Sequence, residues 1–249
     1  MQDTSVVPAE VARFDALASR WWDPHGPMRP LHRMNPARLS WITARIAARF
    51  PDPGGVRVLD VGCGAGLAAE GLARQGYRVL GIDAAGEAIE AARSHAKQAQ
   101  EAGLDLALDY RAGTAEALLT EGVKFPVISA LEVIEHVANP EAFLLTLADL
   151  LEPGGLLFLS TLNRTRRSFL VAKLGAEYLL RLLPVGTHDW KKFVTPAELA
   201  SGLRRAGLNV ADIAGMTPSP LTGGWRAGRD LAVNYIAMAQ RPELVTIRA

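Results

Sequence analysis

Short apolar runs alternate with segments of helical periodicity between residues 56 and 160 of this 249-residue chain. Apolar runs bounded by turn residues predict buried strands, and their alternation with helical segments predicts a parallel sheet with helices on both faces. We expect the strands at 56–61, 78–83, 105–110, 126–131 and 155–160, and helices near 65–75, 86–101 and 140–151. Later runs at 208–213 and 234–239 predict two more strands, forming an antiparallel edge pair. The pattern therefore predicts an α/β fold with a seven-stranded sheet.

Two segments lie outside the predicted core at 56–160. Residues 11–50 have a helical pattern that Trp21–Pro27 interrupts, and we expect them to form a cap over the ligand-binding edge of the sheet. Residues 161–195 form an insertion, which ends where Thr195 is expected to cap a helix that starts at Pro196. Residues 196–241 return to the sheet, so one domain spans 1–249.

The composition limits the possible partners and the cellular location of the protein. The 49% apolar and 21% charged content is that of a globular protein, and the net charge of +1 argues against a nucleic-acid partner. Cys63 is the only cysteine, so no internal disulfide can form. The first ten residues lack the basic-then-apolar order of a signal peptide, and no apolar stretch approaches 18 residues. We therefore expect a cytoplasmic protein.

A glycine turn follows the first predicted strand. Asp60 precedes Gly62, Gly64 and Gly66, and Asp83 ends the second predicted strand. Glycine allows a backbone to approach a ligand closely, and an acid at the tip of the neighbouring strand can accept hydrogen bonds from ribose hydroxyls. Together these residues predict a nucleoside-binding crevice.

The glycine spacing indicates which kind of nucleoside the crevice binds. It is G-x-G-x-G, whereas the dinucleotide fingerprint is G-x-G-x-x-G. This region resembles the first motif of the Rossmann-like S-adenosylmethionine-dependent methyltransferases. Such a site binds no phosphate, and Asp60 would help to hold the cationic amino-acid end of the cofactor. The alternative, a turn that serves only strand–helix packing, leaves the two acids unexplained.

A second cluster, Glu132-Val133-Ile134-Glu135-His136, follows the fourth predicted strand, where a methyl acceptor would lie. Glu132, Glu135 and His136 could bind a divalent cation such as Mg²⁺, which would lower the cost of deprotonating a phenol. Alternatively, His136 acts without metal as a general base or substrate contact, and the acids cap the next turn. Spacing alone leaves both interpretations open.

Several motifs outside the core resemble the ubiquinone-biosynthesis O-methyltransferases over about residues 11–240. They are Phe14–Asp23, Pro30–Leu39, Ser160–Arg164, Gly175–Tyr178, Pro184–Asp189, Lys191–Phe193 and Val233–Tyr235. The resemblance implies methylation of catechol-type hydroxyls on polyprenylated aromatic intermediates, at two steps of the pathway. It implies a polyprenylated catechol or demethylubiquinol as substrate and allows for a biosynthetic complex.

Carried over residue by residue, the resemblance assigns cofactor contacts to Arg38, Gly62, Asp83 and Leu131. It also favours Glu132, Glu135 and His136 as a Mg²⁺ site, with Glu135 and His136 as catalytic residues. The alternatives are a metal-independent methyltransferase of another small lipophilic acceptor and a non-catalytic lipid-binding subunit of a complex.

The insertion is unusually apolar over 168–183 and is flanked by Arg164, Arg166 and Arg167. We expect residues 164–183 to contact the inner face of a membrane, to form a lid over the acceptor, or both. His188 is a further candidate base. Trp21 and Trp22 are expected to pack within the cap rather than to stack on substrate.

Overall fold

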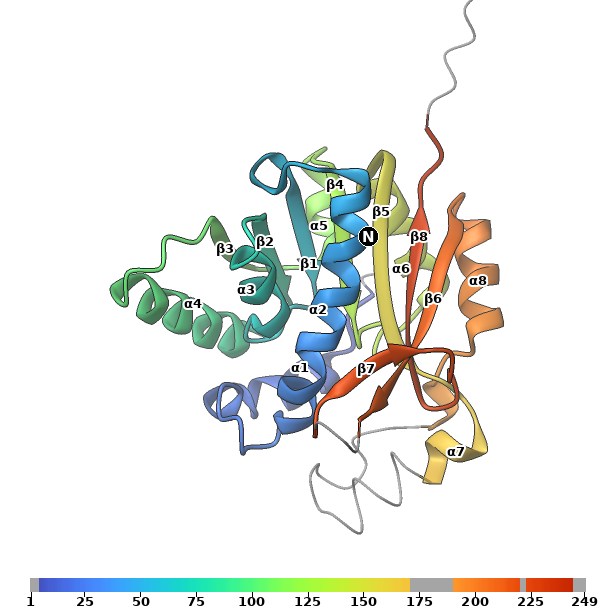
Figure 1. Ribbon diagram of the computed structural model, residues 1–249, viewed down its shortest axis with the longest axis horizontal. Coiled ribbons are helices and arrows are strands. Elements are labelled where there is room, and N and C mark those ends of the chain that lie inside the picture. The colour runs from blue at the N-terminus through green and yellow to red at the C-terminus, as the bar shows by residue number, and fades with distance from the viewer. Residues whose placement is uncertain (1–4, 171–189, 220–222, 244–249) are drawn as a thin grey trace, which may run out of the picture.

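The computed structural model describes residues 5–170, 190–219 and 223–243. These residues form one sheet in the order β3-β2-β1-β4-β5-β8-β6-β7 (Figure 1). The five strands from β3 to β5 are parallel, β8 is antiparallel to both β5 and β6, and β7 is antiparallel to β6. The strand bounds are β1 Arg57–Val61, β2 Arg78–Asp83, β3 Leu108–Ala112, β4 Phe125–Leu131, β5 Leu151–Leu162, β6 Asn209–Pro218, β7 Trp225–Gly228 and β8 Asn234–Gln240.

Helices cover both faces of the sheet, as the alternating pattern predicts. Helices α2, α3 and α4 pack on one face, which is towards the viewer in Figure 1, and α5, α6 and α8 pack on the other. Helix α1 precedes them at the end of the sheet where β1, β2 and β4 finish. The helix bounds are α1 Pro8–Asp15, α2 Arg29–Arg49, α3 Leu67–Ala73, α4 Gly86–Glu101, α5 Ala115–Thr120, α6 Pro140–Leu150, α7 Arg166–Ser168 and α8 Pro196–Arg205.

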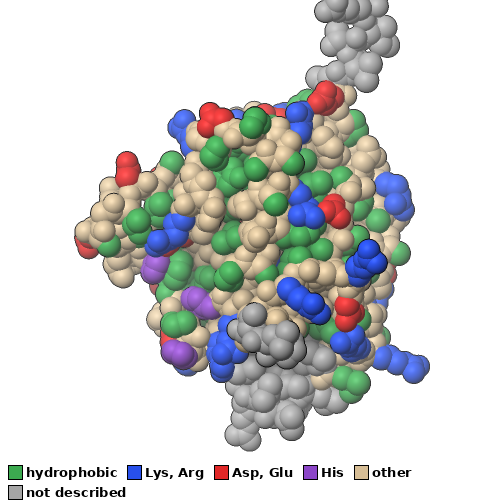
Figure 2. Space-filling view, in the orientation of Figure 1, with side chains coloured by type: hydrophobic (Ala, Val, Ile, Leu, Met, Phe, Trp, Pro, Cys, Tyr) green, Lys and Arg blue, Asp and Glu red, His purple; other side chains and the backbone are tan. Residues whose placement is uncertain are grey.

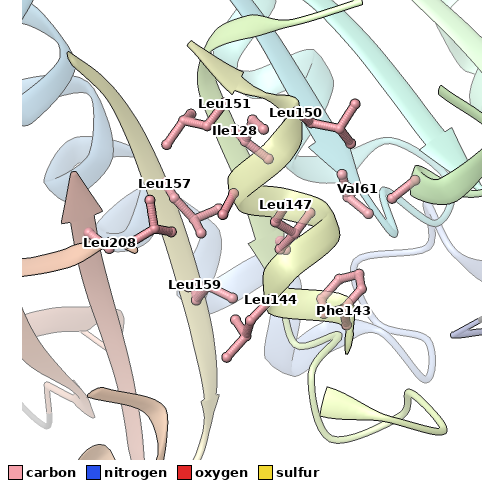
Figure 3. Packing of buried hydrophobic residues seen from close by; sticks show 14 of the residues in the cluster. Val61, Ile128, Phe143, Leu144, Leu147, Leu150, Leu151, Leu157, Leu159 and Leu208 are labelled. Atoms are coloured by element: carbon pink, nitrogen blue, oxygen red, sulfur yellow. The ribbon is translucent and has the colours of Figure 1, made fainter. Parts of the chain in front are cut away.

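One of the two large core clusters lies between β4, β5 and helix α6, and the other lies on the opposite face of the sheet, against α2, α3 and α4. Phe143 and Leu147 of α6 belong to the same buried cluster as Ile128 of β4 and Leu159 of β5 (Figure 3). Each such side chain stabilises the fold by about 1.5–3 kcal/mol through removal of apolar surface from water. Strands covered on both faces need apolar residues at successive positions, which explains why they read as continuous runs rather than as alternation.

The structure corrects three expectations about the sheet. It has eight strands rather than seven, because the short β7 has mostly exposed side chains and so shows no apolar run. Strands β6 and β8 pair antiparallel as expected, but β7, rather than either of them, forms the edge of the sheet. Strand β3 begins at Leu108 and ends at Ala112, beyond the expected 105–110.

The helix after the insertion begins as predicted. Thr195 accepts a hydrogen bond from the Glu198 backbone N–H at 3.3 Å, and the Glu198 carboxylate accepts from the Thr195 N–H at 2.9 Å. This reciprocal pair satisfies two N–H groups at the helix end. Among the residues that the structure describes, no helix has the length and apolar character needed to cross a bilayer.

Candidate functional site

A cavity of about 760 Å³ opens at the carboxyl ends of β1, β2 and β4. Its wall is mostly apolar and includes residues of α1, the turns after the three strands, and β7. Seven predicted site residues line it, namely Gly62, Gly64, Asp83, Leu131, Glu132, Glu135 and His136. The other three, Arg38, Asp60 and Gly66, are buried behind this wall.

The glycine turn has the backbone geometry that the sequence predicts. Gly62, Gly64 and Gly66 have φ values of 68°, 53° and 89°, which side-chain-bearing residues rarely adopt. A Cβ on Gly64 would overlap the Trp21 ring, and a Cβ on Gly66 would overlap the Tyr110 hydroxyl. The glycines therefore also serve packing, because Trp21 of the cap and Tyr110 of β3 lie directly against the turn.

Asp83 lies at the end of β2 with its carboxylate at the cavity wall. Its Oδ2 accepts from the Gly64 N–H and its Oδ1 from the Ala85 N–H, both at 2.8 Å. Burial raises the pKa of Asp83, and these two hydrogen bonds oppose the rise. A carboxylate has about four acceptor sites, so Asp83 keeps capacity for ribose hydroxyls.

Asp60 lies on β1 and is 2% exposed. Its Oδ1 accepts from the Ser129 hydroxyl at 2.6 Å, while its Oδ2 has no hydrogen-bond partner among the described residues. Burial raises the pKa of Asp60 to about 6, opposed by the Ser129 hydrogen bond and the nearby Arg38. A cationic ligand group near this carboxylate would stabilise its ionised form.

Arg38 reaches from α2 and is 3% exposed. Its Nη1 lies 3.6 Å from Oε1 of Glu132, and burial lowers the pKa of Arg38 despite the charges of Glu132 and Asp60. Glu132 also accepts from the Ser160 hydroxyl at 2.7 Å and, with both oxygens, from Asn234 Nδ2 at 3.2 Å. Glu132 is thus engaged by groups of the chain itself.

Glu135 and His136, the other two residues of the predicted cluster, contact β5 and α1. Glu135 is 4% exposed and accepts from the Thr161 hydroxyl at 2.9 Å. Burial and the charge of Glu132 raise the pKa of Glu135 to about 8. His136 Nδ1 lies 3.2 Å from Oε2 of Glu10, which belongs to α1.

This arrangement does not fit the predicted Mg²⁺ site. Glu132 has a left-handed φ of 59° and faces Arg38 and Asn234, Glu135 faces β5, and His136 faces α1. Within the described ranges, no three His, Cys, Asp or Glu side chains are grouped to hold a metal ion. Proximity in sequence suggested a shared ligand set, whereas the backbone turn at Glu132 directs the three groups to different partners.

Sequence reasoning missed Glu10 and Phe14 of α1 as neighbours of His136. The Phe14 ring lies 5.4 Å from the His136 ring at 88°. The four-residue spacing places Glu10 and Phe14 on one helix face, which could have indicated that they contact the same neighbour. The cap was expected to begin at residue 11, so Glu10 was left outside it.

The two cap tryptophans have different surroundings. Trp21 is 6% exposed, packs in the cap cluster and lines the cavity. Trp22 stacks on His95 and donates its indole N–H to the Ala65 carbonyl at 2.9 Å. His188 and residues 171–183 of the insertion lie outside the described residues.

The chain is similar to known proteins along most of its length. The family described as "Methyltransferase domain" matches residues 31–213. A protein of Cereibacter sphaeroides named "Ubiquinone biosynthesis O-methyltransferase" is 49% identical over 97% of this chain and 99% of its own length. A protein of Roseobacter denitrificans with the same name is 47% identical over 96% and 98%.

Solved structures show the same fold at lower identity. Magnesium protoporphyrin IX methyltransferase from Synechocystis PCC 6803, with bound SAM, superposes with a TM-score of 0.62 at 18% identity, covering 96% of this chain and 99% of that one. The plantazolicin methyltransferase BpumL, with bound SAH, gives 0.64 at 19% identity and covers 94% and 97%.

Proposed function

The chain belongs to the ubiquinone biosynthesis O-methyltransferase family, and we propose that it methylates catechol-type hydroxyls of polyprenylated aromatic intermediates at both O-methylation steps of that pathway. The fold and domain are those of an S-adenosylmethionine-dependent methyltransferase. The observation that carries the proposal is the identity of 49% over 97% of this chain and 99% of the relative's length.

The residues around the glycine turn suit S-adenosylmethionine. Asp83 would accept hydrogen bonds from the ribose hydroxyls, and the backbone at Gly62 and Gly64 allows close approach of the ligand. Asp60 and Arg38, which are buried next to the cavity lining, would interact electrostatically with the charged amino-acid end of the cofactor. Leu131 would contact its adenosine or methionine portion. When bound, the cofactor supplies an electrophilic methyl group on a sulfonium.

His136 is the group best placed to take the proton from the acceptor hydroxyl. Its Nδ1 lies 3.2 Å from a carboxylate oxygen of Glu10, and this negative charge would stabilise the imidazolium that forms when the ring takes up the proton. Taking tyrosine as a guide, ionising a phenol at pH 7 costs about 4 kcal/mol, and a positioned base lowers that cost. The cavity wall then holds the oxygen in line with the methyl group.

Glu135 would act beside His136 as a neutral acid. With a pKa of about 8, its carboxyl is protonated at pH 7 and can donate a hydrogen bond to an acceptor oxygen. It lines the cavity and is held by Thr161. We expect Glu135→Ala to abolish turnover while leaving cofactor affinity unchanged.

Mg²⁺ remains a prediction of the family resemblance. In this arrangement a cation would have to displace Arg38, Ser160 and Asn234 from Glu132 before that carboxylate could serve as a ligand. The chemistry above therefore uses only the chain's own residues.

The acceptor side of the cavity suits an apolar tail. It is lined by Val7, which precedes α1, Val11 of α1, Pro218 at the end of β6, Trp225 at the start of β7, and Val233. These residues offer contacts for a prenyl chain but few hydrogen bonds for a polar substituent.

The same edge of the molecule supports contact with an anionic membrane surface. Arg166 and Arg167 of α7 are exposed, as are Arg226 and Arg229, and Leu170 beside them is 55% exposed and lines the cavity. Basic side chains also lie along the lower part of the face in Figure 2. Cations attract acidic headgroups while apolar side chains enter the interface. We propose a cytoplasmic enzyme that works at the inner membrane surface, and sedimentation with anionic liposomes at low salt tests this part.

Methyl transfer from labelled S-adenosylmethionine to a short-chain prenylated catechol tests the function. We expect transfer by the wild-type chain and none by Glu135→Ala, with S-adenosylhomocysteine affinity retained in both. EDTA treatment followed by restored Mg²⁺ tests the metal. Loss and recovery of turnover would support it, and indifference to EDTA would leave the proton transfer to His136. Absence of transfer despite cofactor binding would contradict the proposal, in favour of another lipophilic acceptor or a non-catalytic lipid-binding subunit.

A further inference from the structure

Two stacked rings join the N-terminal cap to helix α4. The Trp22 indole lies on the His95 imidazole with the ring centroids 3.4 Å apart and an interplanar angle of 0°. The Trp22 indole N–H also donates to the carbonyl of Ala65, in the glycine turn, at 2.9 Å. Trp22 therefore contacts α4 through the face of its ring and the glycine turn through its nitrogen.

A buried carboxylate holds the His95 ring. Glu70, in the first turn of α3, is 2% exposed. Its Oε2 is hydrogen-bonded to His95 Nδ1 at 2.5 Å, and its Oε1 accepts from Arg74 Nε at 2.9 Å and Nη2 at 2.7 Å. A buried carboxylate is costly unless its oxygens have partners, so the position of Glu70 favours an imidazole that stays in place. Helix α3 thus fixes the ring on which Trp22 stacks.

The cap next to Trp22 forms part of the cavity wall. Trp21 is 6% exposed, lines the cavity and lies directly against Gly64. Its carbonyl oxygen is hydrogen-bonded to His32 Nε2 of α2 at 2.8 Å. Further cap residues in the wall are Pro27, Met28, Pro30, Leu31 and Met34. Movement of this segment away from α4 would therefore widen the cavity at the glycine turn.

Helix α2, which follows this segment, has attachments of its own. The Asn35 side chain donates from Nδ2 to the Leu67 carbonyl at 2.9 Å, and the Leu39 side chain lies against Gly71 of α3. Ile42 and Ile46 are fully buried in the core cluster on this face of the sheet. Separation of Trp22 from α4 would therefore release the segment before α2 while α2 stays packed.

We propose that the Trp22–His95 pair is a clasp that positions the cap over the glycine turn and sets the rate at which bound S-adenosylmethionine or S-adenosylhomocysteine is released. Neither side chain belongs to the cavity wall that the described residues form, so both are positioning residues that act through Trp21 and its neighbours. This role rests on the proposed binding of the cofactor at the glycine turn.

Removal of either ring should speed release of the ligand. Trp22→Ala and His95→Ala should each raise the dissociation rate of S-adenosylhomocysteine about fivefold to thirtyfold, because each loses the ring stack and one hydrogen bond. The association rate should change much less. Trp22→Phe keeps a ring on His95 and loses only the N–H, so its rate should lie between those of the wild type and Trp22→Ala. Stopped-flow displacement measures these rates.

Two comparisons separate the clasp from a general loss of stability. His25→Ala is the matched control, because His25 is an exposed histidine of the same cap, and its dissociation rate should stay within about twofold of the wild type. In the double variant of Trp22 and His95, release should be at most about threefold faster than in the faster single variant, because residues that act as one unit are not additive. Independent effects would multiply instead.

Hydrogen exchange of the ligand-free chain gives a readout that does not depend on cofactor. Amides of residues 18–26 should exchange faster in Trp22→Ala and His95→Ala, with those of β1 and β4 unchanged. Unchanged dissociation rates, multiplied effects in the double variant, or equal acceleration of exchange throughout the sheet would overturn the clasp. If the wild type does not bind S-adenosylhomocysteine, the proposed function fails, whereas exchange at 18–26 still decides whether the two rings hold the cap.

Discussion

Replacing Asp60 with asparagine should stabilise the folded chain at neutral pH and remove a pH dependence of cofactor binding. The substitution keeps the size of the side chain and an oxygen that can accept from the Ser129 hydroxyl. It removes a carboxylate that is 2% exposed and has one oxygen without a hydrogen-bond partner among the described residues. The change therefore isolates the cost of burying the charge.

The magnitude follows from the pKa of Asp60, which burial raises from 3.8 to about 6. Between these values the folded state binds more protons than the unfolded state, so ionisation opposes folding and stability falls as pH rises. Two pH units correspond to roughly 3 kcal/mol above pH 6. The asparagine variant lacks this loss, so its advantage in unfolding free energy should grow by about 2 kcal/mol between pH 4.5 and pH 7.5.

The affinity for the cofactor should depend on pH in the opposite direction to the stability, rising as the pH rises. A cationic amino-acid end favours the ionised carboxylate, of which only about a tenth is present at pH 5 when the pKa is near 6. The affinity of the wild type for S-adenosylhomocysteine should therefore rise about tenfold from pH 5 to pH 7, and that slope should vanish in Asp60→Asn.

Urea unfolding and calorimetric titration across pH measure the two effects. Asp149→Asn, which makes the same chemical change on the exposed side of α6, is the matched control and should shift neither curve. A constant difference in stability across this range would show that the pKa of Asp60 is not raised. A wild-type affinity that does not depend on pH would remove Asp60 from the binding of the amino-acid end.

Three further substitutions test other parts of the structure. Gly64→Ala should destabilise the chain by about 2 kcal/mol in urea unfolding, because φ is 53° and the Trp21 ring fills the space; an unperturbed midpoint would contradict that packing. Asp83→Ala should weaken S-adenosylhomocysteine binding at least about tenfold, and unchanged calorimetric affinity would refute the ribose assignment. Leu147→Ala, at a fully buried position of α6, should cost about 2–5 kcal/mol without altering cofactor affinity once folded, as denaturant titration and calorimetry would show.

The parallel half of the sheet could be predicted because its signals are local. Strands β1, β4 and β5 are buried and mostly apolar, and the glycines from Gly62 to Gly66 indicate a turn with positive φ values. Strand β3 has mostly exposed side chains, and its bounds were predicted less well. Strand β7 gave no such signal, because its exposed Arg226, Ala227 and Gly228 form a strand only through pairing with β6. The position of β8 between β5 and β6 likewise depends on contacts far apart in sequence.

Seven of the predicted site residues line one cavity, and their side-chain contacts include partners that the sequence did not indicate. Glu132, Glu135 and His136 do line one cavity, but their partners come from α2, β5, β8 and α1, which no spacing rule connects to them. Glu10 is the clearest example. Its contact with His136 joins a residue of α1, outside the predicted core, to the turn after β4, and only the folded chain brings them together.

The place of β8 in the sheet has a consequence for synthesis of the protein. The ribosome completes β5 at Leu162 but reaches the neighbour that pairs with it only at Asn234. Throughout that interval the emerging chain carries a long apolar strand with one unpaired edge, which is a template for association with other chains. Translation that stalls within this interval would leave that edge exposed. Chaperones that recognise apolar strands should therefore bind the emerging chain mainly at this stage.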